Sequence, residues 1–75
     1  MKGRLVLTID DLRPDDGGSR VVERRLLSQS GVTRVFVSTV TEAAYVEYDP
    51  AIVSPIEIVE IVRAAGFRAT DASHY

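Results

Sequence analysis

The sequence contains no cysteine, and this absence limits its chemistry more than any other feature of the composition. Without cysteine the chain forms no disulfide, no thiolate metal site and no thiol nucleophile. It also has a single histidine, His74, next to its last residue. One histidine without partner ligands does not make a metal site, because zinc sites use about four ligands. We therefore expect no cofactor and no tight site for a soft metal ion.

Long apolar runs are also absent. No stretch approaches the roughly 20 apolar residues that a membrane-spanning helix needs. Residues 1–4 lack the apolar core of a signal peptide, so we expect a cytoplasmic protein with no membrane partner. The net charge of −2 argues against broad nucleic-acid binding, which requires many cations to neutralise phosphates.

Catalytic patterns are missing as well. The sequence shows no nucleophile–base pair, no phosphate-binding loop and no pair of acids at a catalytic spacing, so no catalytic residue and no enzyme activity are expected. The length of 75 residues predicts one small domain over residues 1–75, with residues 71–75 as a frayed tail.

The clearest structural signal is a pair of alternating runs, residues 32–38 and 44–48, joined by the short segment 39–43. Alternation of β-branched and aromatic residues is typical of half-buried antiparallel strands, so a hairpin is predicted. Its core face carries Val35, Val37, Ala44, Val46 and Tyr48. Its other face carries Arg34, Phe36, Ser38, Tyr45 and Glu47.

A strand and a helix precede this hairpin. Residues 4–9 alternate in the same way, with Leu5, Leu7 and Ile9 on the core face. A helix is predicted over about residues 18–28, with Val22 and Leu26 one turn apart on its inner face. Gly31 is predicted to be the left-handed residue that terminates it.

A helix and a strand follow the hairpin. Ser54-Pro55-Ile56-Glu57 predicts a capped helix start, which continues to about Ala65. Its inner stripe is predicted to consist of Ile58, Ile61, Val62 and Ala65. Gly66 is predicted to end the helix, and residues 67–70 to form a short last strand. The order predicts an α+β fold, a ferredoxin-like βαββαβ sandwich, in which a four-stranded antiparallel sheet carries two helices on one face.

In this order the sequence resembles the heavy-metal-associated (HMA) domains of copper chaperones and metal-transporting ATPases. The residues that carry the resemblance are Val22-Glu23, Leu26, Gly31-Val32, Val35, Val37, Glu42-Ala43, residues 44–50, Ile58, Ile61 and Gly66-Phe67. The resemblance implies the same fold and a relation to metal transport.

The family's metal site is not present in this sequence. The resemblance implies a Cys-x-x-Cys pair at the start of the first helix, which falls at Asp15 and Gly18, and a preceding Met, which falls near Arg13. Soft Cu(I) requires thiolate or thioether donors, whereas Asp15 is a hard donor and Gly18 has no side chain.

The loop before the first helix is rich in aspartate, namely Asp10, Asp11, Asp15 and Asp16. Carboxylates suit Mg²⁺, Ca²⁺ or Mn²⁺, so one hypothesis is that the chain binds or carries a metal ion through this loop. The other interpretation is that one aspartate caps the helix, others favour its positive end and the rest are solvated. The spacing matches no named cation-binding loop.

Arginines are concentrated on or near the first helix: Arg13, Arg20, Arg24, Arg25 and Arg34. Metallochaperones of the HMA family dock on acidic partner domains through basic residues in this region. The resemblance therefore implies a docking face, at Arg13, Arg20, Arg24 and Arg25, for another protein such as a metal-transporting ATPase or a related domain. The alternative is an ordinary solvated face, whose arginines pair locally with Glu23 and the loop aspartates.

Phe36 and Tyr45 are predicted to lie on the open face of the sheet, near Val6. An exposed apolar patch favours contact with a partner or with a second copy of the chain. Two alternatives remain: scattered surface aromatics, and stacking of nucleic-acid bases, which Glu47 on the same face and the lack of an RNA-binding motif disfavour. The leading hypothesis is a small non-enzymatic docking or regulatory module of the HMA type without its thiolate site.

Overall fold

The computed structural model describes residues 2–10, 12 and 17–72. Its elements are β1 (Gly3–Asp10), α1 (Gly18–Leu27), β2 (Val32–Ser38), β3 (Ala43–Tyr48), α2 (Pro55–Ala64) and β4 (Arg68–Asp71). The predicted order of elements and the ferredoxin-like α+β fold are confirmed. Asp71, which was predicted to belong to a frayed tail, instead pairs with Leu7 as the last residue of β4. His74 lies outside the described residues.

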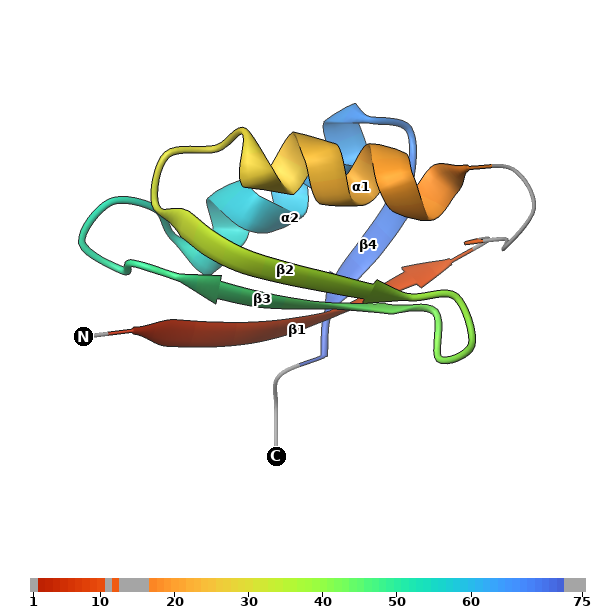
Figure 1. Ribbon diagram of the computed structural model, residues 1–75, viewed down its shortest axis with the longest axis horizontal. Coiled ribbons are helices and arrows are strands. Elements are labelled where there is room, and N and C mark those ends of the chain that lie inside the picture. Colours follow the sequence, from red (N-terminus) through yellow and green to blue (C-terminus); the bar gives the residue numbers. More distant parts are fainter. Residues whose placement is uncertain (1, 11, 13–16, 73–75) are drawn as a thin grey trace.

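The sheet has the strand order β2-β3-β1-β4, and every pair of neighbours is antiparallel. Both helices lie on one face of this sheet, and the other face is left open (Figure 1). α1 packs chiefly against β2, and α2 packs against β4. None of the described helices is long and apolar enough to cross a membrane, and the cytoplasmic location stays a prediction.

The core lies between the sheet and the two helices. The predicted inward residues of β1 and β3 are all buried, and Val22 and Leu26 of α1 meet them with no exposed surface. The prediction for α2 was partly wrong, because Val59 is buried and Ala65 is only half-buried, whereas Ile61 is half-buried but packs against the core as predicted. The helix is rotated toward β4, so the buried stripe is Ile58, Val59 and Val62.

Both ends of α2 have the predicted termination signals. The Ser54 hydroxyl accepts a hydrogen bond from the Glu57 amide at 3.2 Å, and the Glu57 carboxylate accepts one from the Ser54 amide at 3.1 Å. At the other end Gly66 adopts a φ of 98°, and its amide donates to the Arg63 carbonyl at 2.9 Å. These bonds satisfy backbone groups that a helix leaves without partners at its ends.

Gly31 has the predicted positive φ, 94°, but for a different reason. α1 ends at Leu27 with Ser28 as its C-cap, so Gly31 belongs to the turn that enters β2. There its carbonyl accepts a hydrogen bond from the Asp49 amide at 2.7 Å. A Cβ atom at Gly31 would lie 2.9 Å from both Ile52 and Val53, so the glycine lets two connections pack against each other.

An irregularity in β2 decides which side chains reach the open face. Val32 pairs with Tyr48, and Arg34 already pairs with Glu47, so β2 has one extra residue at this point. The Thr33 hydroxyl donates a hydrogen bond to the Glu47 carbonyl at 3.1 Å. The bulge allows Val32 to pack against the core while Arg34 lies on the opposite face.

A pair of isoleucines in α2 tests this core. Ile58 is fully buried, whereas Ile56 in the same helix is 75% exposed. We expect Ile58→Ala to lower the free energy of unfolding by about 2–5 kcal/mol, because it leaves a cavity. Ile56→Ala is the matched control and should change stability by less than about 0.5 kcal/mol. Urea denaturation followed by circular dichroism measures both, and equal effects would contradict the described orientation of α2.

Two glycines with nearly the same backbone conformation test the packed turn. Gly31 has a φ of 94° and Gly66 one of 98°, but no atom lies within 4 Å of a Cβ built at Gly66. Both substitutions to alanine should cost about 1–2 kcal/mol for the left-handed conformation. Gly31→Ala should cost about 1–3 kcal/mol more, because its methyl group overlaps Ile52 and Val53. The denaturation midpoints of the two variants measure the loss of stability. Equal losses would show that Ile52 and Val53 move aside for the added methyl group at little cost.

Candidate functional site

The start of α1 is the position at which the resemblance places the family's metal site. The N-cap residue is Gly17, with a φ of 76°, so no side chain caps the helix at this position. The alternative interpretation that one aspartate caps this helix was therefore wrong at the N-cap. Gly18 is the first residue of α1 and is buried. Asp11, Arg13, Asp15 and Asp16 lie outside the described residues, so their predicted roles stay predictions.

The residues present do not fit a soft metal ion. Gly18 contributes no side-chain donor at the helix start, and the sequence has no cysteine to replace it. Within the described residues, no three His, Asp or Glu side chains lie close enough together to hold a cation. The hypothesis of a carboxylate site depends on aspartates outside that part of the chain and stays untested.

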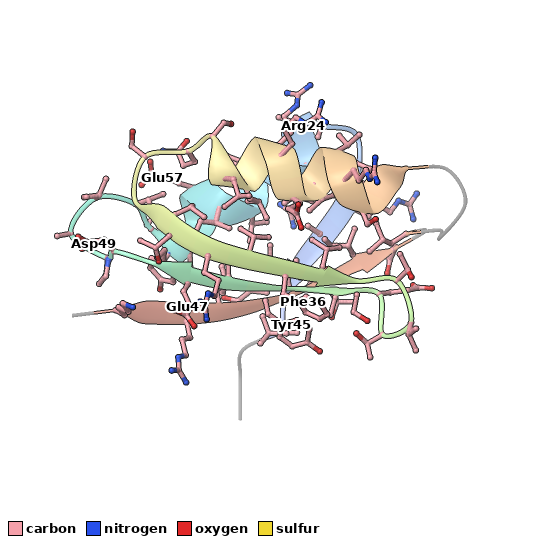
Figure 2. All side chains as sticks on the ribbon, viewed as in Figure 1. Arg24, Phe36, Tyr45, Glu47, Asp49 and Glu57 are labelled. Carbon is pink, nitrogen blue, oxygen red and sulfur yellow. The ribbon has the colours of Figure 1, made fainter. Side chains whose placement is uncertain are left out.

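The outer face of α1 carries the predicted arginines. Arg20, Arg24 and Arg25 are all exposed, and Arg24 points away from the sheet (Figure 2). Val21 and Leu27 lie beside them with 42% and 48% of their surface exposed. In the described part of the chain, ion pairs join Lys2 to Glu47 and Arg63 to Glu60, and none involves an arginine of α1. The local pairing with Glu23 that the alternative interpretation required is therefore not seen.

The open face of the sheet holds a second group of side chains. Phe36 and Tyr45 point away from the helices (Figure 2), with ring centroids 5.9 Å apart and ring planes 29° apart. Phe36 is 61% exposed and Tyr45 is 40% exposed. They line a shallow groove of about 450 Å³, whose other residues are Arg4, Leu5, Val6, Arg34, Val46 and Glu47.

Two arginines of this groove add to the predicted aromatic pair. The sequence placed Arg34 on the same face as Phe36 and also counted it among the arginines near the first helix, and the structure places it beside Phe36, across the sheet from α1. Arg4 had been given no role, although its alternation with Leu5 placed it on the same face as Val6. Both arginines pair in register with Glu47, which lies on β3 between them.

No family model matches the chain. Human copper-transporting ATPase 2 is 33% identical to it over 54 residues, and these residues make up 72% of this chain. The mouse protein of the same name is 37% identical over 49 residues, 65% of this chain. The chain spans only 4% of the human ATPase and 3% of the mouse one, so it matches a small part of each.

Solved structures of similar fold align with nearly the whole chain. The copper-binding domain of HMA7, a P-type ATPase, aligns with a TM-score of 0.89 and 26% identity, covering 97% of this chain and 96% of that one. Oxidized MerP from Ralstonia metallidurans aligns with the same TM-score at 19% identity, covering 97% of this chain and all of MerP, which supports the fold alone. The chain belongs to the heavy-metal-associated domain family. It is a member without cysteine.

Rebuilding the thiolate pair tests where the family's metal site lies in this HMA domain. The unmodified chain should bind neither Cu(I) nor Zn²⁺ tightly at neutral pH under reducing conditions. Asp15→Cys combined with Gly18→Cys should bind Cu(I) or Zn²⁺ in a one-to-one complex, because two thiolates at family spacing reach one ion. Metal content after desalting measures this, and each single substitution is a control.

Two outcomes would contradict this assignment. If the folded double variant retains no more metal than the singles, the loop does not follow the family register. If the unmodified chain binds metal tightly and Asp15→Ala with Asp16→Ala abolishes binding, the carboxylate hypothesis is correct instead.

Proposed function

We propose that this HMA domain is a non-enzymatic docking module related to metal transport, which binds another protein through the outer face of α1. The observation that carries the proposal is the combination of exposed Arg20, Arg24 and Arg25 with exposed Val21 and Leu27. No ion pair within the described residues holds these arginines, so they are available to a partner's carboxylates, and the apolar side chains beside them offer surface to bury.

The relatives indicate what kind of partner to test. One chain of the Atx1–Cu(I)–Ccc2a complex aligns with this domain at a TM-score of 0.82 and 24% identity. That structure holds two proteins in contact, so the fold supports docking between domains. We propose that the partner is an acidic domain of a metal-transporting ATPase or a related protein. Recognition would depend on charge and would not require a thiolate-bound metal in this chain.

A charge reversal on α1 tests the docking face. The ¹⁵N-labelled domain would be titrated with the isolated HMA domain of a copper-transporting ATPase that carries an acidic surface. Arg24→Glu should weaken binding by about tenfold, since it places like charges across the contact. Raising the salt concentration should weaken binding by the unmodified chain, because exposed charges are screened.

Arg68→Glu is the matched control. It makes the same change in net charge at an exposed position of β4, away from α1. Binding unaffected by Arg68→Glu but lost with Arg24→Glu supports the proposal. Equal losses for the two variants would show that only total charge matters, and shifts confined to other elements would place the docking surface elsewhere.

A further inference from the structure

The open face of the sheet carries a small patch that the docking face on α1 does not explain. We call the side chains of two cross-strand pairs, Arg34 with the half-buried Glu47 and Phe36 with Tyr45, the open-face patch. Neither helix covers it, since both lie on the opposite face (Figure 1). Phe36 exposes 61% of its surface there, beside Tyr45 at 40%. Aromatic side chains bury more area than most others, so an exposed pair offers a strong contact.

The register of β2 and β3 gives this patch an unusual property. Arg34 lies directly across from Glu47, and Phe36 lies directly across from Tyr45. Each pair therefore joins two groups that attract each other, one by opposite charge and one by ring contact. Consider a twofold axis that runs along the strands, midway between β2 and β3 and above the sheet. This axis places each residue of β2 in one copy above its cross-strand partner of β3 in the other copy, and the reverse.

We propose that the open-face patch is the interface for a second copy of this chain, related by that twofold axis. Arg34 of each copy then faces Glu47 of the other, and Phe36 of each faces Tyr45 of the other. A twofold interface uses the same patch on both subunits, so the patch must be complementary to itself. Two sheets stack at about 10 Å, a separation that these long side chains span. This inference does not depend on the proposed docking of α1.

Other arrangements and other occupants fit the patch less well. An axis along β3 itself would place Glu47 against its own copy, and like charges repel. An axis between β3 and β1 would pair Glu47 with Arg4 but would leave Phe36 outside, because Tyr45 would then face Val6. A nucleic-acid strand would bring phosphates to Arg4 and Arg34 but also to Glu47, which lies in register between them.

The interface should be weak because it is small. With the axis between β2 and β3, only these two strands of each copy overlap, because β2 is the edge of the sheet. Two strands at about 4.8 Å and about six residues at ~3.3 Å each give an overlap of roughly 10 by 20 Å. This overlap is smaller than the contacts of stable complexes, so association is transient. Dimer formation should therefore depend on concentration, and sedimentation equilibrium from about 10 µM to 1 mM covers the range in which weak complexes dissociate.

Charge exchange provides the decisive test. Arg34→Glu alone places two carboxylates against each other at each contact, and Glu47→Arg alone places two cations there. Either change should weaken dimerisation by about tenfold or more, which corresponds to ~1.4 kcal/mol. An equimolar mixture of the two variants restores opposite charges at both contacts. The mixture should therefore associate more strongly than either variant alone.

Two further variants separate this geometry from general effects. Phe36→Ala should also weaken dimerisation by about tenfold, because central aromatic residues carry much of the affinity of an interface. Arg68→Glu is the control, since it lies on an exposed part of β4 outside the patch and should leave the dimer unchanged. Circular dichroism confirms that each variant is folded.

If a variant does not fold, the unmodified chain still decides the question. In a mixture of isotope-labelled and unlabelled protein, filtered NMR spectra should show contacts between Phe36 of one copy and Tyr45 of the other. A chain that stays monomeric at about 1 mM would overturn the proposal, as weak interfaces are populated at that concentration. A mixture of the charge variants that gains nothing would also overturn it. Saturable binding of single-stranded polyuridylate at the patch, without dimer formation, would favour nucleic acid instead.

Discussion

The structure depends on the burial of one face of a small sheet under two ten-residue helices. Leu7, Ile9, Leu26 and Ile58 meet in this layer with no exposed surface, and it forms the core of the described residues. A chain of 75 residues has little apolar surface beyond what such a layer needs. Two surfaces are therefore left uncovered, the outer side of the helices and the opposite face of the sheet. Both of the contacts that we propose lie on these surfaces.

The domain has the fold of its family in a sequence without cysteine. The packed turn of Gly31 against Ile52 and Val53, the capped ends of α2 and the core stripe of α1 need no metal ion. They depend on backbone conformation, hydrogen bonds and apolar packing alone. The helix start has Gly17 and Gly18 and no donor for a soft ion in the described residues. A function for this chain must therefore be argued from its surfaces, because fold alone does not imply it.

The two surfaces differ in the partner that they suit. On α1 three arginines lie beside two apolar side chains and Glu23, and no ion pair of the described residues holds them, so the surface has an excess of positive charge that favours an acidic protein. On the open face, Glu47 lies in register between Arg4 and Arg34, and Lys2 reaches it at 4.0 Å. Three cations thus surround one carboxylate, while Arg34 with Glu47 and Phe36 with Tyr45 form complementary cross-strand pairs, and this pairing favours a second copy of the same face.

The sequence by itself determined the order of the elements, the inward residues of β1 and β3, and both ends of α2. These features follow from local rules, because alternation sets the faces of a strand and capping residues satisfy the backbone beside them. Phe36 and Tyr45 could be placed on the open face for the same reason. The start of α1 at Gly18 was also predicted, but its cap was not, since an aspartate cap was one interpretation and the N-cap is Gly17.

Only the tertiary structure decided the features that depend on how elements meet. Alternation alone would put Val32 on the same face as Arg34, but the bulge at Thr33 turns Val32 to the core and leaves Arg34 beside Phe36. The packing of α2 against β4 buries Val59, which the spacing of the predicted stripe did not include, and leaves Ile61 half-buried at the edge of the core. The cross-strand register, which sets Arg34 against Glu47, comes from the pairing of two chain segments. In a hairpin the connection fixes the register near the turn, and the bulge at Thr33, which shifts it further along, is visible only in the paired strands.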